Sequence, residues 1–324
     1  MRQWFVLLLC LASTICAGRP TYEEALAEIG CVLRESRTPD DIRLLAIPRA
    51  TASGHTGTFV EIGAYDGVDS QTRVLETCYG WSGVLIEANP EHYKWLLRAN
   101  RSSATKRVFS AVCQPPPNTT TGTVTMRLAG GTISSVVGLA YAHDRRYGVH
   151  FRRNSSTAQV PCSTLPHIMA NNGLSSGATF LSLDVEGAEK YVLETVPLVN
   201  FPFDAVLVEA DGLSREKDQQ VDKMLQNAGL LQLEHPVTRY SINHLFSRQL
   251  WNFTPAHDVA VQAVLAQKLA QVDFPLSIQL SGILGLRNNS LTGHDTDKAG
   301  KQLARKLLEG LPEAVDAFLN QKEE

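Results

Sequence analysis

Short apolar runs alternate with helix-like segments from Thr58 to about residue 246, and this alternation limits the possible folds more than any other feature. Strands covered on both faces appear as continuous apolar runs, and helices between them favour parallel connections. We therefore predict an α/β fold with a doubly wound, mostly parallel sheet. The expected strands are 58–62, 83–87, 107–112, 179–184 and 205–209, and the expected helices are 70–78, 91–101, 188–196 and 215–228.

Two parts of this region break the alternation. Runs at 230–234 and 239–246 follow each other without a helix, which predicts an antiparallel pair at one edge of the sheet. Residues 115–157 are rich in Pro, Thr, Gly and Arg, and we expect a strand near 124–128 within long loops. Insertions of this kind commonly carry substrate contacts. The basic residues between 143 and 153 either bind an anionic acceptor or form a solvated loop.

The first 18 residues are typical of a cleaved secretory signal peptide, with one positive charge, about a dozen apolar residues and small residues at the end. The alternative is an uncleaved anchor helix, although the run is shorter than the roughly 20 residues of a bilayer span. We expect no transmembrane span after cleavage. The predicted organisation is then a helical extension at 19–50, the α/β domain at 51–250 and a helical C-terminal extension at 251–324.

The remaining cysteines and the glycosylation motifs also fit an oxidising compartment. Removal of the signal leaves four cysteines, which predicts two disulfides with three possible pairings. We expect a glycoprotein that is secreted or held in the lumen of the endoplasmic reticulum or Golgi. A net charge of −3 gives no support for a nucleic-acid partner. The sequence contains no CxxC pair, so the cysteines do not indicate a zinc site. The glycosylation motifs begin at Asn100, Asn118, Asn154, Asn252 and Asn288.

The segment FVEIGAYDG, residues 59–67, ends the first predicted strand in a glycine-containing turn. A dinucleotide-binding turn has the pattern GxGxxG. Counted from Gly63, the second and third glycine positions hold Tyr65 and Val68, so the sequence excludes dinucleotide binding. What remains is an acid, Glu61, followed by two glycines that let the backbone approach a ligand and bend toward the next helix.

Two further acidic positions are expected at the same edge of the sheet. Glu87 ends the second strand, where an acid accepts hydrogen bonds from ribose hydroxyls; the alternative is a solvent-facing acid. Asp184 and Glu186 follow the fourth strand, and Glu186 has the alternative role of capping the next helix. The GxSxG match at 173–177 is not a serine hydrolase elbow, because helix-like sequence precedes it and a strand follows.

These motifs together resemble the FkbM-type methyltransferases, and within them the animal Star-like branch. The resemblance covers about residues 58–246 and rests on EIGAYDG, GWSGVLIEANP, Asn100-Arg101 and LDVEGAE. It implies a class I methyltransferase (Rossmann-like) fold that uses S-adenosylmethionine. The cofactor-binding residues it implies are Glu61, Gly63, Tyr65, Asp66, Gly67, Glu87, Asn89 and Asp184.

The resemblance implies O-methyl transfer to a hydroxyl acceptor, with Asp184 as first choice of base and Glu186 as second. Two departures from the family pattern affect the cofactor site. Tyr65 stands where Asn is common, and Gln71 replaces the Asn of the usual Ser-Asn-Thr run, which is Ser-Gln-Thr at residues 70–72 here. We expect no metal, although Asp184, Glu186 and Asp211 are a conceivable ligand set. The alternative function is a non-catalytic Star-like protein that binds partner proteins in secretory trafficking.

Overall fold

The computed structural model of the chain describes residues 57–128, 134–137, 156–210, 214–232 and 243–248, together with Cys31 and Glu35. The predicted signal peptide, most of the N-terminal extension, the basic residues between 143 and 153 and the C-terminal extension lie outside the described residues. Three of the five glycosylation motifs also lie outside them; Asn100 and Asn118 are described and exposed. No helix among the described residues is long and apolar enough to cross a membrane.

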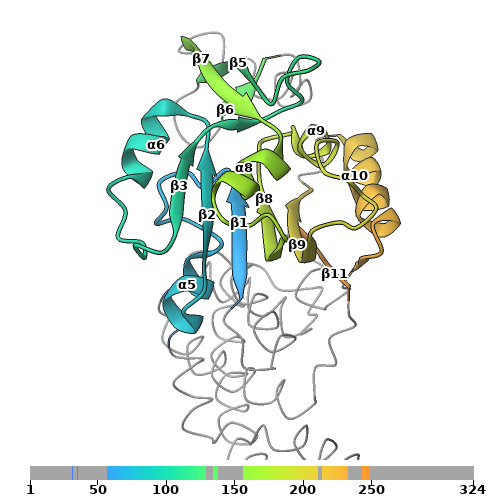
Figure 1. Cartoon of the computed structure of the whole chain (residues 1–324), viewed down its shortest axis with the longest axis horizontal. Coiled ribbons are helices and arrows are strands. Elements are labelled where there is room, and N and C mark those ends of the chain that lie inside the picture. The colour runs from blue at the N-terminus through green and yellow to red at the C-terminus, as the bar shows by residue number, and fades with distance from the viewer. Residues whose placement is uncertain are drawn as a thin grey trace, which may run out of the picture.

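Within the described residues, seven strands form a central mixed sheet in the order β10-β11-β9-β8-β1-β2-β3 (Figure 1). Neighbouring strands from β9 to β3 are parallel, whereas β11 runs antiparallel to both β9 and β10. The predicted parallel sheet with an antiparallel edge pair is therefore confirmed. The strands are β1 (Thr58–Ile62), β2 (Ser82–Glu87), β3 (Lys106–Phe109), β8 (Ala178–Leu183), β9 (Phe203–Glu209), β10 (Leu231–Gln232) and β11 (Asn243–Ser247).

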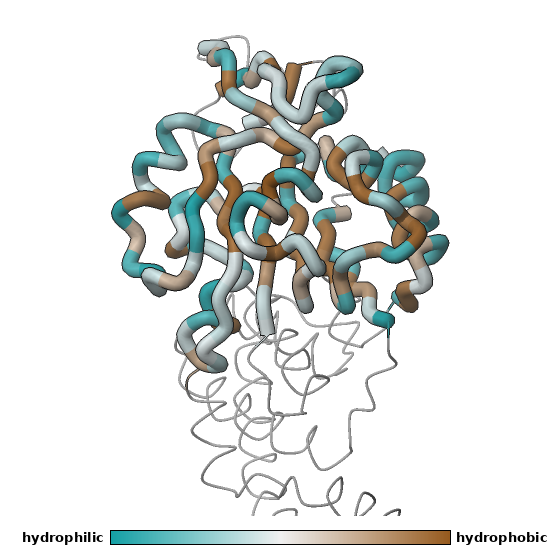
Figure 2. The backbone as a smooth tube through the Cα atoms, viewed as in Figure 1, coloured by the Kyte–Doolittle hydropathy of each residue, from teal (hydrophilic) through white to brown (hydrophobic). Residues whose placement is uncertain are grey.

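Helices cover both faces of this sheet, because successive side chains of each strand point to opposite faces. On one face, Val60, Ile62 and Leu181 pack in a core shared with α8, α9 and α10. On the other face, Phe59 and Phe180 pack with α5 and α6. Figure 2 shows the hydrophobic residues concentrated along the central strands. The helices are α5 (Arg73–Tyr79), α6 (Pro90–Leu96), α8 (Leu165–Asn171), α9 (Glu189–Leu193) and α10 (Arg215–Asn227).

The segment between β3 and α8 builds a second, smaller sheet, which lies over the carboxyl ends of β2 and β3 in Figure 1. Its strand order is β4-β7-β5-β6, with β4 parallel to β7 and the other pairs antiparallel. The strand expected near 124–128 is the second half of β5. The strands are β4 (Ala111–Val112), β5 (Thr121–Leu128), β6 (Ser134–Val136) and β7 (Ser156–Ser163).

Several predicted elements have different bounds. The helix expected at 91–101 is α6, which ends at Leu96, and the helix expected at 188–196 is α9, which ends at Leu193. Local hydrogen bonds explain two further differences. The strand expected at 107–112 is broken at Ser110, whose N–H still donates to the Glu87 carbonyl before β4 leaves to pair with β7. The helix expected from residue 70 begins only at Arg73. Residues 70–72 precede it because they hydrogen-bond the buried carboxylate of Glu61.

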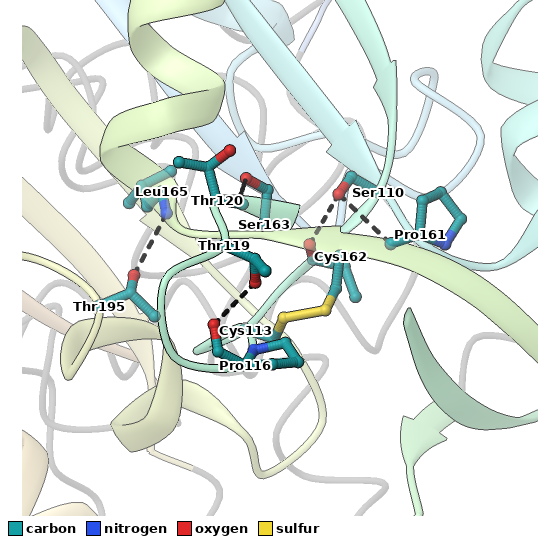
Figure 3. Close-up of a disulfide and its surroundings, with 11 residues drawn as sticks. Ser110, Cys113, Pro116, Thr119, Thr120, Pro161, Cys162, Ser163, Leu165 and Thr195 are labelled. Carbon is teal, nitrogen blue, oxygen red and sulfur yellow. Dashed lines mark hydrogen bonds between the residues drawn. A yellow bond between two sulfur atoms is a disulfide. The ribbon is translucent and has the colours of Figure 1, made fainter. Parts of the chain in front are cut away.

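The structure has two disulfides, which selects one of the three pairings that the sequence left open. Cys31 is bonded to Cys78 of α5, and Cys113 is bonded to Cys162 of β7. The second disulfide fastens the end of β4 to β7, as Figure 3 shows. Ser163 strengthens the same corner, since its hydroxyl donates to the Thr120 carbonyl at 2.6 Å. Both cysteines thus belong to the small sheet, and the disulfide fixes the strand by which the chain enters that sheet after β3.

Removing the Cys113–Cys162 disulfide is expected to lower the free energy of unfolding by about 2–5 kcal/mol, because the bond closes a long loop in the unfolded chain. The bond spans 49 residues of sequence. The double variant Cys113→Ser, Cys162→Ser, compared with wild type by urea unfolding under oxidising conditions, measures the loss. Unchanged stability in the double variant would contradict this role. Wild type under reducing conditions is the reference, because it loses both disulfides.

Candidate functional site

A cavity of about 220 Å³ lies at the carboxyl edge of the central sheet. The chain leaves β1 toward β2 on one side and leaves β8 toward β9 on the other, so this is the point where the winding of the sheet reverses. Open α/β sheets bind ligands at such a switch point. The cavity is bordered by the ends of β1, β2 and β8 and by the small sheet.

Gly63 forms the floor of the cavity directly after β1. Its N–H and that of Ala64 both donate to the Ile86 carbonyl, at 3.0 and 3.1 Å, which turns the chain sharply. Gly63 has φ +87°, and a Cβ atom there would lie 1.8 Å from the backbone oxygen of Asp184. Only glycine allows the ends of β1 and β8 to come this close.

Glu61 is buried under the loop that follows the turn. Its carboxylate accepts hydrogen bonds from the Ser70 hydroxyl at 2.6 Å, the Thr72 hydroxyl at 2.5 Å and the Gln71 N–H at 2.9 Å. The buried guanidinium of Arg101 donates to the same two hydroxyls, at 2.7 and 3.0 Å. Ser70 and Thr72 therefore link a buried anion to a buried cation, which fixes the 67–72 loop beside the cavity.

Glu87 ends β2 with its carboxylate already oriented. One carboxylate oxygen accepts from the Tyr65 N–H at 2.8 Å, and the other accepts from the Asn89 N–H at 2.7 Å. Burial raises the pKa of Glu87 from 4.5 to about 7, although these backbone hydrogen bonds lower it in part. Each carboxylate oxygen has a second lone pair, so Glu87 is able to accept further hydrogen bonds from a ligand in the cavity.

An aromatic group stands beside Glu87. The rings of Tyr65 and His92 meet edge-on with centroids 4.7 Å apart, and His92 stacks on Trp95 at 5.3 Å. Tyr65 and His92 line the cavity. Tyr65 has φ +49°, a left-handed conformation that asparagine adopts more readily than tyrosine. The ring of Tyr65 packs against the other two aromatic rings.

Asp184 and Glu186 line the cavity from the turn after β8. Burial, and after it the negative charge of Glu186, raises the pKa of Asp184 to about 7. The neighbour of Asp184 on the adjacent strand is Glu209, at the end of β9. Glu189 has a structural role: its carboxylate accepts from the Gly187 N–H at 2.9 Å and pairs with Lys217 at 2.6 Å. Glu189 thereby holds the turn that presents Asp184 and Glu186.

The structure brings most of the predicted site residues together, and gives three of them other contacts. Asp66 accepts from the N–H groups of Val68 and Asp69, which closes the turn, and Gly67 lies against Leu96. Asn89 caps α6 and donates to the Ser134 hydroxyl at 2.9 Å. These three residues do not line the cavity; they stabilise the turns and the helix that carry its lining residues. The predicted residues that line the cavity itself are Glu61, Gly63, Tyr65, Glu87, Asp184 and Glu186.

The small sheet contributes the opposite wall, which is mostly apolar. Val112, Met126 and Val136 line the cavity there, together with the hydroxyl-bearing residues Ser110 and Ser134. The described residues contain no group of three or more His, Cys, Asp or Glu side chains arranged to hold a metal ion. Asp211, the third member of the conceivable metal set, lies outside the described residues.

Sequence reasoning missed Arg101 and Glu209 as parts of this site. Arg101 appeared only within a quoted motif, and nothing local indicates that it contacts a loop about 30 residues earlier. Glu209 had a detectable signal, because it is an acid at the carboxyl end of a predicted strand. In a parallel sheet all such ends meet at one edge.

Comparison with known families gives one match. The model of the methyltransferase FkbM domain matches residues 61–231, from Glu61 at the cavity to Leu231 in β10. Searches of curated proteins and of solved structures returned no match. The matched segment contains the last two residues of β1, all of β2 through β9 and every cavity residue named above.

Proposed function

The chain belongs to the FkbM methyltransferase family, whose domain has the class I methyltransferase fold, and from that premise we propose that it is an S-adenosylmethionine-dependent O-methyltransferase of the secretory pathway. The observation that carries the proposal is Glu87. Its buried carboxylate stands at the end of β2, is held by two backbone N–H groups and lines the cavity. This is the position from which an acid holds ribose hydroxyls in doubly wound folds.

The described residues suit S-adenosylmethionine in charge. The acidic residues of the cavity suit a ligand that carries a sulfonium and an ammonium group. They are Glu61, Asp69, Glu87, Asp184 and Glu186.

When bound, S-adenosylmethionine supplies an electrophilic methyl group, and the electron pair of the breaking sulfur–carbon bond stays on sulfur. The contribution of the protein is to hold the acceptor oxygen in line and to take its proton. Orientation provides most of the rate in such a reaction. Asp184 is the proposed base because its carboxylate lines the cavity, with Glu186 as second choice.

The acceptor is proposed to enter along the small sheet. Val112, Met126 and Val136 offer an apolar surface there, and Ser110 and Ser134 offer hydroxyls for orientation. An apolar wall with a few placed polar groups is typical of small-molecule sites. The hydroxyl that receives the methyl group would then face Asp184 across the cavity.

The secretory location is supported by the two disulfides together with the signal-like first 18 residues. Structural disulfides persist in oxidising compartments. S-adenosylmethionine is charged and does not cross bilayers unaided, so activity there requires a transporter or an extracellular supply. This requirement is the reason to test cofactor binding before searching for an acceptor.

Calorimetric titration of S-adenosylmethionine into the disulfide-intact protein tests the function. We expect Glu87→Ala to weaken binding by about 10- to 150-fold, because a hydrogen bond to a charged group contributes roughly 1.5–3 kcal/mol. The matched control is Glu91→Ala, which removes an exposed carboxylate from α6 that pairs with Lys94 at the surface. Circular dichroism confirms that each variant is folded.

Two results would count against the proposal in different ways. Equal affinity of wild type and folded Glu87→Ala would refute the role of Glu87. No binding by folded wild type would favour the alternative function, a Star-like protein that uses this fold to bind partner proteins during secretory trafficking. Screening for a protein partner would then replace the search for a methyl acceptor.

A further inference from the structure

The carboxyl groups of Asp184 and Glu209 form a pair that the proposed reaction does not yet explain. β8 and β9 are parallel neighbours (Figure 1). Because Leu183 lies opposite Val208, the residues that follow them, Asp184 and Glu209, leave the sheet side by side. Two ionised carboxylates in one buried site repel each other and have no proton to share, which favours a state with one member protonated.

Two observations favour Glu209 as the member that holds the proton. Asp184 lines the cavity, whereas Glu209 stands behind it and does not. The second oxygen of Glu209, Oε2, is buried without a hydrogen-bond partner among the described residues. An ionised carboxylate in this position would leave negative charge unsatisfied, which costs far more than a neutral carboxyl group does.

The surrounding charges act in the same direction. Glu61 from β1, with Glu186 and Glu189 from the turn and α9, contribute negative charge around the pair. From α10, Lys217 is engaged with Glu189 and Asp218. On β11, the register partner of Glu209 is Asn243, and the following His244 pairs with Asp222 at 2.8 Å. In the part of the chain that the structure describes, neither Asp184 nor Glu209 has a salt bridge.

We propose that Glu209 is the proton-holding partner of Asp184: its carboxyl group donates a proton in the hydrogen bond to Asp184, so that the pair carries one negative charge, located on the carboxylate that faces the cavity. Glu209 is thus a positioning residue and does not itself touch the acceptor. The inference rests on the proposed function in one respect: the role of Asp184 as base, which takes the proton of the acceptor hydroxyl. The proton shared by Asp184 and Glu209 does not require any ligand.

The burial and charges described above raise the pKa of Glu209 to about 10, which agrees with a retained proton at neutral pH. A carboxyl group whose pKa is raised on folding binds more protons in the folded than in the unfolded state. Its stabilising contribution is complete below the unfolded pKa of about 4.5 and is lost as pH rises toward the folded value. Wild type should therefore lose stability between pH 6 and 9 relative to a variant that cannot ionise there.

The first experiment uses the protein without any ligand. Urea unfolding of wild type and Glu209→Gln is compared from pH 6 to 9, because glutamine keeps the shape and a donor to Asp184. We expect the unfolding equilibrium constant of wild type to rise, relative to the variant, by a factor that approaches tenfold per pH unit, which corresponds to one proton. Parallel curves would overturn the proposal. Glu216→Gln, an exposed change on α10, is the matched control and should give parallel curves.

NMR of carbon-13-labelled wild type over the same pH range provides a second test. The Glu209 carboxyl carbon should have the chemical shift of a protonated carboxyl group. This measurement does not depend on whether a variant folds. A Glu209 carboxyl that is ionised at pH 7 would overturn the proposal.

The second experiment asks whether Glu209 sets the ionisation of Asp184. Affinity for S-adenosylmethionine is expected to increase with pH as Asp184 ionises. Glu209→Leu removes the donor, so this increase should move to higher pH, whereas Glu209→Gln should leave it in place. An unmoved increase in Glu209→Leu would overturn the positioning role. Absence of binding in every protein, together with the expected unfolding result, would reject the proposed function and leave the proton-sharing pair intact.

Discussion

Gly63→Ala is expected to lower the free energy of unfolding by about 4 kcal/mol or more, the range reached by the most damaging single substitutions. The methyl group would lie 1.8 Å from the backbone oxygen of Asp184, and neither backbone is able to move away without separating β1 from β8. The left-handed φ of +87° adds about 1–2 kcal/mol for any residue with a Cβ atom. Urea unfolding measures the total.

A second glycine provides a closely matched control. Gly173 has φ +84°, nearly that of Gly63, but no atom lies within 4 Å of the position of its Cβ. Gly173→Ala should therefore cost only the conformational term, about 1–2 kcal/mol. The difference between the two variants isolates the contact with the Asp184 carbonyl. Equal losses would show that the close approach of the two strands is not what requires glycine at position 63.

Asp184→Asn is expected to reduce methyl transfer by about 10²- to 10⁴-fold, the usual contribution of a general base, while S-adenosylmethionine still binds with the lower affinity expected of uncharged Asp184. The amide keeps the shape of the carboxylate but is unable to take a proton. Formation of S-adenosylhomocysteine in the presence of a methyl acceptor measures turnover, and calorimetry measures binding. Full turnover in a folded Asp184→Asn protein would exclude Asp184 as the base.

The pH dependence of turnover provides an independent check on Asp184. Its pKa is raised to about 7, and only the ionised carboxylate accepts a proton. Turnover is measured at saturating S-adenosylmethionine, because Glu87 also has a pKa of about 7 and its ionisation would otherwise change cofactor binding. Turnover should then increase as pH rises through about 7 and level off above it. Asp69→Asn is the matched control, because Asp69 lines the same cavity but is exposed. It should leave this pH profile unchanged.

The sequence predicted the central sheet well because its signals are local. Each strand predicted for the central sheet between Thr58 and Glu209 appears in the structure with ends shifted by a few residues at most, whereas β6 and β7 of the small sheet were not predicted. The family motifs were also local, and the match over residues 61–231 confirmed them. Element ends were less predictable. At Ser110 the chain leaves one sheet for another, a change that only contacts with β7 determine.

The sequence by itself determined the parallel α/β fold, the family and the acidic residues at the strand ends, because apolar periodicity and contiguous motifs are written along the chain. Tertiary structure alone decided which acids act together. Glu61 is held by its loop, whose hydroxyls also bond Arg101. Glu87 is oriented by two backbone N–H groups, and Asp184 lies beside Glu209. It also selected the pairing of the four cysteines. These results depend on distances between residues far apart in sequence, which close packing of the folded chain sets and no local pattern encodes.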